Sequence, residues 1–508
     1  MSEHPQVRLS REEIAKIEIG HTEVGTAQKW TLSLLFIAVI TLYPICQFCA
    51  HQPFADWQDE GEIKASIKAY ETTIEDNSLL RRFLLAPAQR LMTGVFHTGN
   101  EKVKVGRGGW LFFSGDCEYL VDPGFLDAEV LSKRAQSGVH SDAVAAIRDF
   151  DRQLKARGIR LILLPVPVKP MIYADKLGAE TFPLQNPSFA EFKSRLEAAG
   201  ITVIDLAETF AELRQSGVET YLKTDTHWTP EAMEVAAQLT ARAVDPQAAA
   251  PSSSVLRRSV TNLGDIAAML KLPDCEKFFP AETVQVADYD QRPSRDGDVL
   301  LLGDSFANIY SLAALNWGEN GGLAEALGFY LGKPIDALLR NDAGAFATRQ
   351  LLANELKRGR DRLAGKKTVI YEFAIRELVN GDWKLIDLTL KKAPESDFLT
   401  VSAPVVVTAT VLNTSSVPRP YSAPYRDHVM SLHLGDINGN EQALVYAVSM
   451  RNNVWTSAAH LRVGDTVKIR LEPYEAREDE FGNWTRSEFD DENLLLAEPV
   501  YGEIVSVK

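Results

Sequence analysis

The chain has 508 residues, of which 45% are hydrophobic and 24% are charged, so it is long enough for two or more globular domains of ordinary composition. Its formal net charge of −15 argues against binding to nucleic acid or to anionic lipid through a basic surface. The same acidity would repel a uronic-acid polymer unless a local basic groove compensates for it.

The N-terminal region has the pattern of a membrane anchor. Residues 1–29 form a polar tail, and residues 30–50 follow as an apolar segment that has no charged residue from Thr31 to Ala50. A helix of this length spans about 30 Å, which is enough for a bilayer core. A cleaved signal peptide and a buried helix of a soluble domain are the alternatives. The long, acid-rich tail and the absence of an Ala-x-Ala cleavage site disfavour the signal peptide.

A charged connecting region follows this segment. Residues 51–95 are rich in helix formers and predict a helical stalk, with helices near Gly61–Ile74 and Leu79–Leu91. Residues 101–121 predict strands around a glycine-rich turn at Gly106–Gly109.

Helical and strand patterns alternate over residues 96–390. Strands separated by helices predict an α/β domain with a mostly parallel sheet that is flanked by helices. In such sheets, catalytic groups gather at the carboxyl ends of the strands. The expected strands are 160–166, 201–206, 299–302 and 367–373, and the expected helices are 141–156, 189–198, one ending at 213, 231–242, 323–331 and 343–356.

A serine stands at the end of one of these expected strands. The apolar run Val299–Leu302 is interrupted by Gly303 and Asp304, and Ser305 follows at the break. A serine on a tight turn after a buried strand presents its hydroxyl at the sheet edge, beside backbone N–H groups that can bind an oxyanion. The alternative is an ordinary structural turn, because short matches of this kind occur by chance.

A serine nucleophile needs a base, and the base needs an orienting group. Asp225 and His227 lie two residues apart, on the same side of an extended segment. Thr229 and Pro230 then predict the N-cap and first position of a helix, so the pair lies on a loop before that helix. The alternative is a solvated loop histidine whose neighbour caps the helix.

These two segments resemble a known family. Asp225-Thr-His227-Trp228, followed by Gly303-Asp304-Ser305-Phe306, is similar to the SGNH-hydrolase-like O-acetyltransferases of bacterial exopolysaccharides, the AlgX/AlgJ alginate O-acetyltransferase type. The order Asp, His, Ser is permuted relative to ordinary SGNH hydrolases, and the alginate proteins share it. The segments Gly106–Phe113 and Tyr371–Leu378 resemble further parts of the family, so that the likeness spans roughly residues 96 to 385.

The resemblance implies an enzyme that acetylates sugar hydroxyls through an acetyl-serine. Ser305 would attack the acetyl donor, His227 would take its proton, and Asp225 would orient the imidazole. The family also implies a polysaccharide acceptor, a membrane-bound O-acyltransferase that delivers the donor, other assembly proteins, and a single-pass inner-membrane protein with its catalytic domain in the periplasm. The alternatives are a periplasmic carbohydrate acetylesterase and a non-catalytic polysaccharide-binding scaffold.

Four further residues are candidates for contact with substrate or oxyanion: Arg376, Asn316, Tyr371 and Lys169. Arg376 matches an arginine in the family's late Glu-x-x-x-Arg segment, and its alternative is a salt bridge with Glu372 or Glu377. Lys169 follows a strand end and is therefore expected on the same rim of the sheet as the serine.

Neither a metal nor another cofactor is expected. The four cysteines are Cys46, Cys49, Cys117 and Cys275, and neither of the last two has a histidine in metal-ligand register. No phosphate-binding loop is present. Cys117 and Cys275 either form a disulfide or remain as two unpaired core thiols.

Residues 395–508 predict a small all-β domain, either an OB-like barrel or a sandwich. The strand-like runs are 401–412, 443–450 and 466–471, and Gly464-Asp465 predicts a turn before the last of them. Some aromatic residues here have side chains suited either to stacking on sugar rings or to the domain core: Tyr421, Tyr425, Trp455 and Trp484.

Overall fold

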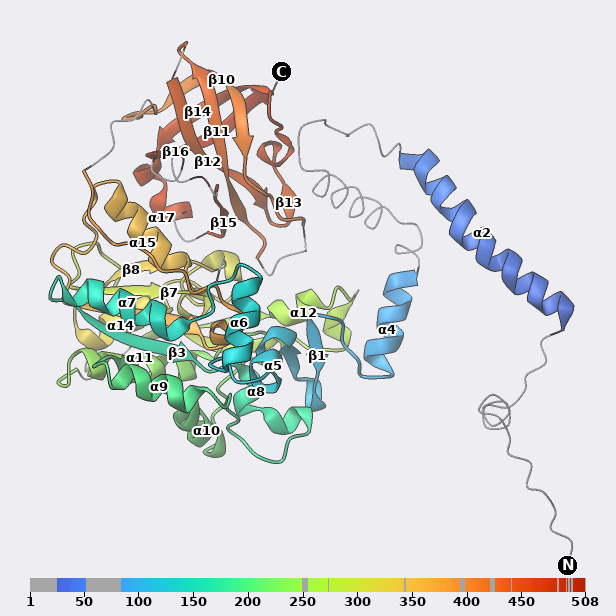
Figure 1. Cartoon of the computed structure of the whole chain (residues 1–508), viewed down its shortest axis with the longest axis horizontal. Helices are drawn as coiled ribbons and strands as arrows, with labels where there is room; N and C mark the ends of the chain where they lie inside the picture. The colour runs from blue at the N-terminus through green and yellow to red at the C-terminus, as the bar shows by residue number, and fades with distance from the viewer. Residues whose placement is uncertain are drawn as a thin grey trace, which may run out of the picture. The chain divides into compact units, whose positions relative to one another are not determined.

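The computed structural model (Figure 1) describes residues 25–51, 84–248, 255–272, 274–341, 344–392, 398–420, 425–439, 441–481, 484–489, 491, 494 and 497–507. The chain divides into two compact units, Met1–Leu91 and Met92–Lys508. The helix expected at Gly61–Ile74 lies outside the described residues.

The first unit contains a 26-residue helix, α2 (Thr26–His51), over the segment expected to be an anchor. Apolar side chains in its first half are exposed, among them Trp30, Leu34 and Phe36. Within the described part of the chain, no helix meets the combined requirement of length and apolar character for crossing a membrane. A shorter helix, α4 (Ala86–Gly94), overlaps the end of the helix expected at Leu79–Leu91.

The second unit is built on a five-stranded parallel sheet with the order β4-β3-β9-β7-β8. Its three middle strands are buried on both faces, because their sequences are predominantly apolar. The bounds are β3 (Arg160–Val166), β4 (Thr202–Val203), β7 (Val299–Gly303), β8 (Asp336–Leu339) and β9 (Thr368–Ala374). The prediction of a mostly parallel sheet is confirmed, with β8 as an additional edge strand.

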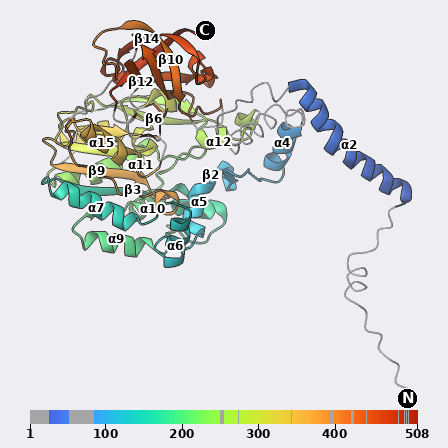
Figure 2. The same ribbon diagram turned by 45° about the horizontal axis from the view of Figure 1, so that its top comes forward.

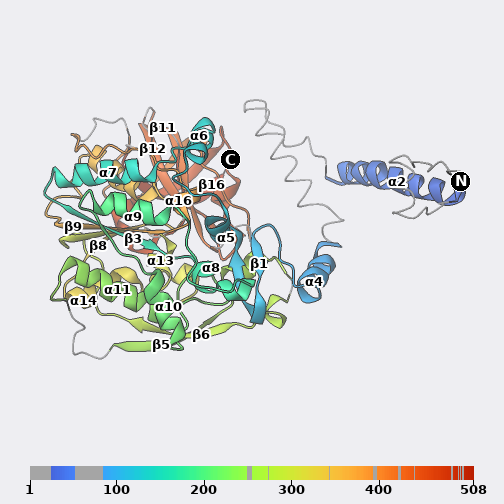
Figure 3. The same ribbon diagram turned by 60° about the horizontal axis from the view of Figure 1, so that its bottom comes forward.

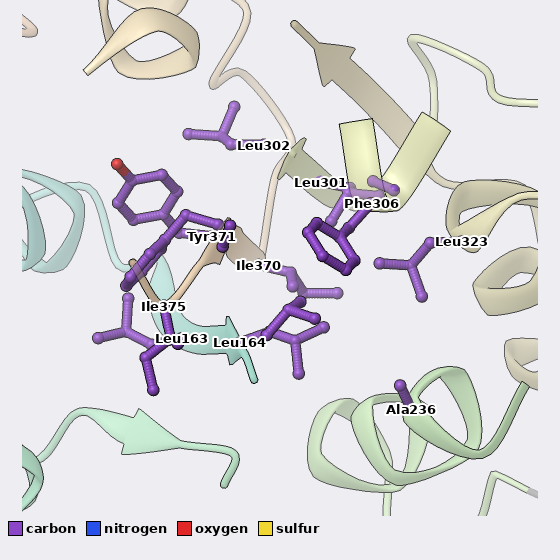
Figure 4. Close-up of a cluster of buried hydrophobic side chains, with 14 of the residues drawn as sticks. Leu163, Leu164, Ala236, Leu301, Leu302, Phe306, Leu323, Ile370, Tyr371 and Ile375 are labelled. Carbon is purple, nitrogen blue, oxygen red and sulfur yellow. The ribbon is translucent and has the colours of Figure 1, made fainter. Parts of the chain in front are cut away.

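Helices cover both faces of this sheet. Helices α7 and α9 lie on one face, and α11 and α14 lie on the other (Figures 2 and 3). Figure 4 shows Ala236 of α11 and Leu323 of α14 near Leu164 and Ile370 of the sheet. On the opposite face, the ring of Tyr371 packs edge-on against Phe150 of α7. The bounds are α7 (Ala143–Lys155), α9 (Phe189–Glu197), α10 (Ala207–Gln215), α11 (Pro230–Val244), α14 (Leu323–Leu331) and α15 (Ala347–Lys357).

Two stretches of the second unit differ from expectation. The hairpin β1 (Val103–Val105) and β2 (Leu111–Phe113) is present, but residues from Ser114 to Val121 form helix α5 instead of a strand. An antiparallel ribbon of β5 (Leu256–Asn262) and β6 (Glu282–Asp288) is present, although neither strand is among the expected ones. Residues of β5 are exposed or half-buried, so the strand lacks the apolar alternation that would predict it.

The C-terminal part is a closed β-barrel of five strands in the order β10-β11-β12-β16-β14. Pairing of β10 with both β11 and β14 closes the sheet, which excludes the sandwich and matches the strand count of a Greek-key barrel of the OB type. Strands β12 and β16 form its one parallel pair among the described strands of the closed barrel. The bounds are β10 (Val405–Thr414), β11 (His428–Ile437), β12 (Glu441–Arg451), β14 (Thr466–Pro473) and β16 (Pro499–Val507), with short β13 (Val454–Trp455) and β15 (Arg486–Ser487) alongside.

Cys117 and Cys275 are unpaired, so the disulfide alternative is wrong. Cys275 is buried in a small satellite core with Leu111 and Ile266, and Cys117 is half-buried against the main core.

Candidate active site

Ser305 begins helix α13 (Ser305–Asn308), directly after β7, at the carboxyl end of the sheet. Asp304 is the N-cap of this short helix, and its Oδ1 accepts the N–H of Phe306 at 2.8 Å. Its Oδ2 accepts the N–H of Ala374, at the end of β9, also at 2.8 Å. One carboxylate therefore holds the turn that carries Ser305 and connects it to the neighbouring strand.

Gly303 has no room for a side chain. A Cβ at this position would lie 2.7 Å from Ala307 Cβ, 2.9 Å from Glu372 Oε2 and 3.1 Å from Leu339 Cδ2. Gly303→Ala is therefore expected to lower the free energy of unfolding by about 1–3 kcal/mol, measured by chemical denaturation. The double variant Gly303→Ala/Ala307→Gly removes the shortest contact and should recover part of the loss. Equal stability of Gly303→Ala and wild type would contradict this account.

The loop that carries Asp225 and His227 is fastened to the serine helix by its next residue, Trp228. The indole Nε1–H of Trp228 donates to the Phe306 carbonyl at 3.0 Å, and the Tyr310 hydroxyl donates to the Trp228 carbonyl at 2.6 Å. The fully buried Trp228 therefore sets the distance between the loop and the helix.

The three candidate residues form a continuous hydrogen-bonded chain. Asp225 Oδ1 lies 2.6 Å from His227 Nδ1, and His227 Nε2 lies 2.9 Å from Ser305 Oγ. Asp225 and His227 are buried, whereas Ser305 is half-buried. This geometry has the form of a Ser-His-Asp triad: a hydroxyl beside a base, and a base beside a carboxylate that selects its tautomer.

Electrostatics within the pair favour the charged forms of both groups. Burial alone would raise the pKa of Asp225, but the charge and hydrogen bonds of His227 lower it to about 2. Burial alone would lower the pKa of His227, but the charge and hydrogen bond of Asp225 raise it above the ordinary value of 6.5. A stronger base at His227 is suited to removing a hydroxyl proton.

Two residues that sequence reasoning missed hold the second oxygen of Asp225. The indole Nε1–H of Trp317 donates to Asp225 Oδ2 at 2.7 Å, and the backbone N–H of Asp265 donates to the same atom at 3.0 Å. The Asp265 carboxylate accepts both the N–H and the hydroxyl of Thr226, at 2.7 and 2.8 Å. No local motif marks either residue, since both reach the loop from distant segments.

Asp225, His227 and Asp265 offer potential metal-ligand atoms within 4.8 Å of one another. Their oxygen and nitrogen atoms are engaged with each other, with Trp317, with Thr226 and with Ser305. This set of hydrogen bonds fits a proton-transfer triad better than it fits a cation.

A second carboxyl group, that of Glu372, contacts the turn that carries Ser305. Glu372 Oε2, on β9, accepts the N–H of Asp304 at 2.8 Å. Burial and the neighbouring Asp304 raise the pKa of Glu372 well above its ordinary value of 4.5. The folded protein therefore keeps a proton on Glu372 that the unfolded chain releases.

This proton makes stability depend on pH. Its contribution to stability is present below the unfolded pKa and is lost as pH rises through the folded pKa. Glu372→Gln cannot ionise and keeps both a carbonyl oxygen and a donor, so its melting temperature should exceed that of wild type by a margin that widens from about pH 5 to about pH 9. Thermal unfolding across that range tests this, with the exposed Glu208→Gln as control. A constant difference would contradict it.

Arg376 lies beside the triad, with Asp116 as its ion-pair partner. Its Nη1 lies 2.9 Å from Asp116 Oδ1, so the alternative of a pair with Glu372 or Glu377 is replaced by a bond to helix α5. Its guanidinium lies 6.0 Å from the ring centroid of Phe306. Burial raises the pKa of Asp116, and Arg376 opposes that rise.

The other three sequence candidates have different surroundings. Asn316 lines the cavity in a left-handed conformation, and its Nδ2–H donates to the Ala314 carbonyl. Tyr371 donates its buried hydroxyl to the Ala345 carbonyl. Lys169 is fully buried, donates to the carbonyls of Leu111 and Lys223, and lies outside the cavity lining.

The triad residues, Arg376, Asn316 and Tyr371 line a cavity of about 610 Å³, a volume typical of small-ligand sites. Its lining includes the triad, Arg376 and Asn341, which follows β8 and whose Oδ1 accepts from Asn308 Nδ2 at 2.9 Å. Asn341 was also missed by sequence reasoning, because the short strand before it was not predicted.

Comparison with known proteins identifies one family of acetyltransferases. A family model described as the SGNH hydrolase-like domain of acetyltransferase AlgX matches residues 103–375, more than half of the chain. The probable alginate O-acetylase AlgJ of Pseudomonas aeruginosa is 32% identical over 145 residues, which is 28% of this chain and 33% of that protein. The corresponding protein of Pseudomonas fluorescens is 27% identical over 276 residues, 51% of this chain and 66% of that protein.

The matched segments thus span between a third and two thirds of the length of these relatives. Among solved structures, the O-acetyltransferase domain of Pseudomonas putida AlgJ aligns with a TM-score of 0.40 and 24% identity, covering 54% of this chain and 91% of that one. Pseudomonas aeruginosa AlgX aligns with a TM-score of 0.36 and 15% identity, covering 73% and 90%.

Proposed function

Because the chain belongs to the AlgX family of SGNH hydrolase-like acetyltransferases, we propose that it is an O-acetyltransferase that esterifies hydroxyl groups of a bacterial exopolysaccharide. The observation that carries the proposal is the hydrogen-bonded chain from Asp225 through His227 to Ser305, at the edge of an accessible cavity.

The reaction is a double displacement. His227 Nε2 takes the hydroxyl proton of Ser305 as Oγ attacks the acetyl carbonyl carbon, and the imidazolium returns that proton to the leaving group of the donor. A sugar hydroxyl then loses its proton to His227 and attacks the acetyl-serine, which restores the Ser305 hydroxyl. The Ser305 N–H and the amide groups of Asn316 and Asn341 are candidate donors to the oxyanion.

We further propose that the protein acts at a membrane. In this proposal residues 30–50, which include the exposed apolar side chains of Trp30, Leu34 and Phe36, form a single membrane anchor, and the catalytic domain lies in the periplasm. A membrane-bound O-acyltransferase supplies the acetyl group in this arrangement, and other polysaccharide-assembly proteins present the acceptor.

Hydrolysis is the second candidate function. Ser305 is half-buried and lines an open cavity, so water reaches the same acetyl-serine that a sugar hydroxyl attacks. The same triad then makes the protein a carbohydrate acetylesterase.

The test uses the full chain, a chromogenic acetyl ester and oligosaccharide acceptors. Acetyl groups trapped on the Ser305 peptide, together with acetylated oligosaccharide, are the expected result in mass spectrometry. Ester cleavage with acetate as the only product would favour the esterase. A correctly folded protein that neither cleaves the ester nor becomes acetylated would leave the polysaccharide-binding scaffold as the function.

A further inference from the structure

The cavity beside Ser305 is lined not only by the α/β domain but also by the C-terminal barrel. Two residues from the loop before β11, Tyr425 and Arg426, belong to its lining. We propose that these barrel residues form the acceptor subsite, in which a neutral sugar ring stacks on Tyr425 and its hydroxyls bind Arg426. This inference rests on the proposed function and adds to it the class of acceptor.

Specific contacts hold the barrel against the carboxyl ends of the strands. Arg340, the residue between β8 and Asn341, is only 8% exposed. Its guanidinium donates to the Arg486 carbonyl of the barrel and lies 3.6 Å from Glu488. Burial alone would raise the pKa of Glu488, but Arg486 and Arg340 lower it to about 2, so this interface carboxylate stays ionised.

A second ion pair, between Arg360 of the α/β domain and Glu498 of the barrel, also joins the two domains. Two pairs that differ in position limit rotation of the barrel, so Tyr425 and Arg426 keep their distance from the triad.

Tyr425 packs against a buried histidine, His428. Its ring stacks on His428 with centroids 6.0 Å apart and planes inclined by 17°. His428 is buried and hydrogen-bonds to Ser449 and Ser487 at 2.6 and 3.1 Å. Burial and the nearby Arg340 lower the pKa of His428 to about 4, so the ring under Tyr425 is neutral at physiological pH. A fixed, half-buried aromatic ring in a cavity wall suits the apolar face of a sugar.

The charges of the lining indicate which sugar. The exposed charged residues of the lining are two carboxyl residues, Glu101 and Glu118, and two cations, Lys102 and Arg426. Two of the cations are engaged elsewhere, Arg376 with Asp116 and Arg340 with Glu488. Among its described residues the lining therefore has no excess of exposed positive charge that would attract a uronate chain, whereas a neutral hexose chain requires none.

The experiment measures equilibrium binding of a neutral β-linked gluco-oligosaccharide to the full chain by calorimetry, and compares it with a mannuronate oligomer of equal length. Tyr425→Ala should weaken binding of the neutral oligomer about fivefold to tenfold, while Tyr425→Phe keeps the ring and binds like wild type. Arg426→Ala should also weaken binding. Arg462→Ala, an exposed barrel arginine outside the cavity, is the matched control.

Acetyl-ester cleavage without acceptor provides a separate readout, because it depends on the triad and not on the barrel wall. It should be unchanged in Arg462→Ala, which lies outside the cavity lining. Equal binding by Tyr425→Ala and wild type, equal weakening by Arg462→Ala, or tighter binding of the mannuronate oligomer would each overturn the inference. Failure of wild type to cleave the ester would instead count against the proposed function, because binding is measured without catalysis.

Discussion

Full-length Ser305→Ala is expected to cleave a chromogenic acetyl ester slower than wild type by a factor on the order of 10⁴ or more, with little change in melting temperature. The variant removes the oxygen that is the nucleophile in the proposed mechanism and that lies 2.9 Å from His227 Nε2, but it removes only one hydrogen bond at the rim of a cavity. Steady-state turnover and thermal unfolding of the same preparation measure both effects.

Ser311→Ala is the matched control, since this serine lies six residues later on the same segment. Its hydroxyl donates to the buried Glu325 at 2.6 Å, and Ser311 is not among the described residues that line the cavity. Its loss should lower stability by about 1 kcal/mol and leave turnover nearly unchanged. If the two variants lost activity equally, the assignment of Ser305 as nucleophile would be wrong.

Asp225→Asn is expected to reduce kcat/KM for the same ester by about 10³–10⁴-fold. An asparagine keeps the size of the side chain but supplies no negative charge at 2.6 Å from His227 Nδ1. In wild type, kcat/KM should rise with pH through the raised pKa of His227, because only the neutral imidazole accepts the serine proton. In Asp225→Asn the residual activity should rise at a lower pH.

The control variant Asp265→Asn removes a neighbouring negative charge that does not contact the imidazole of His227. Asp265 holds the loop through Thr226, and asparagine preserves an acceptor for that contact. Its rate should stay within about tenfold of wild type. A pH–rate profile of Asp225→Asn that coincides with that of wild type would show that Asp225 does not act on the imidazole.

The segments that carry the triad were predictable because each combines a local structural signal with a chemical one. Val299–Leu302 is a buried strand that ends in a turn, and Thr229-Pro230 marks a helix start just after His227. Such signals depend on neighbours in sequence. They were therefore sufficient to predict the strand before Ser305 and the helix after His227.

The supporting residues depend on neighbours in space instead. Asp116 meets Arg376 across 260 positions, and Trp317 and Asp265 reach Asp225 from separate segments. Lys169 was correctly placed after a strand, but its side chain turns inward to backbone carbonyls. Strands β5, β8, β11 and β16 were not predicted, because they are exposed, short, or lack a clear alternation of apolar and polar residues.

The order of strands in the parallel sheet has a consequence for biosynthesis. β9 is the last of the five strands to be synthesised, yet it lies in the middle, between β3 and β7. A nascent chain that has released β3, β4, β7 and β8 still lacks the strand that joins the two halves. The turn that carries Ser305 also depends on β9, because Asp304 accepts a hydrogen bond from the N–H of Ala374. The pairs β3–β4 and β7–β8 can form earlier, but they stay separate from each other until residue 374 emerges, so we expect slow folding of this domain and a need to protect its apolar strands during translation.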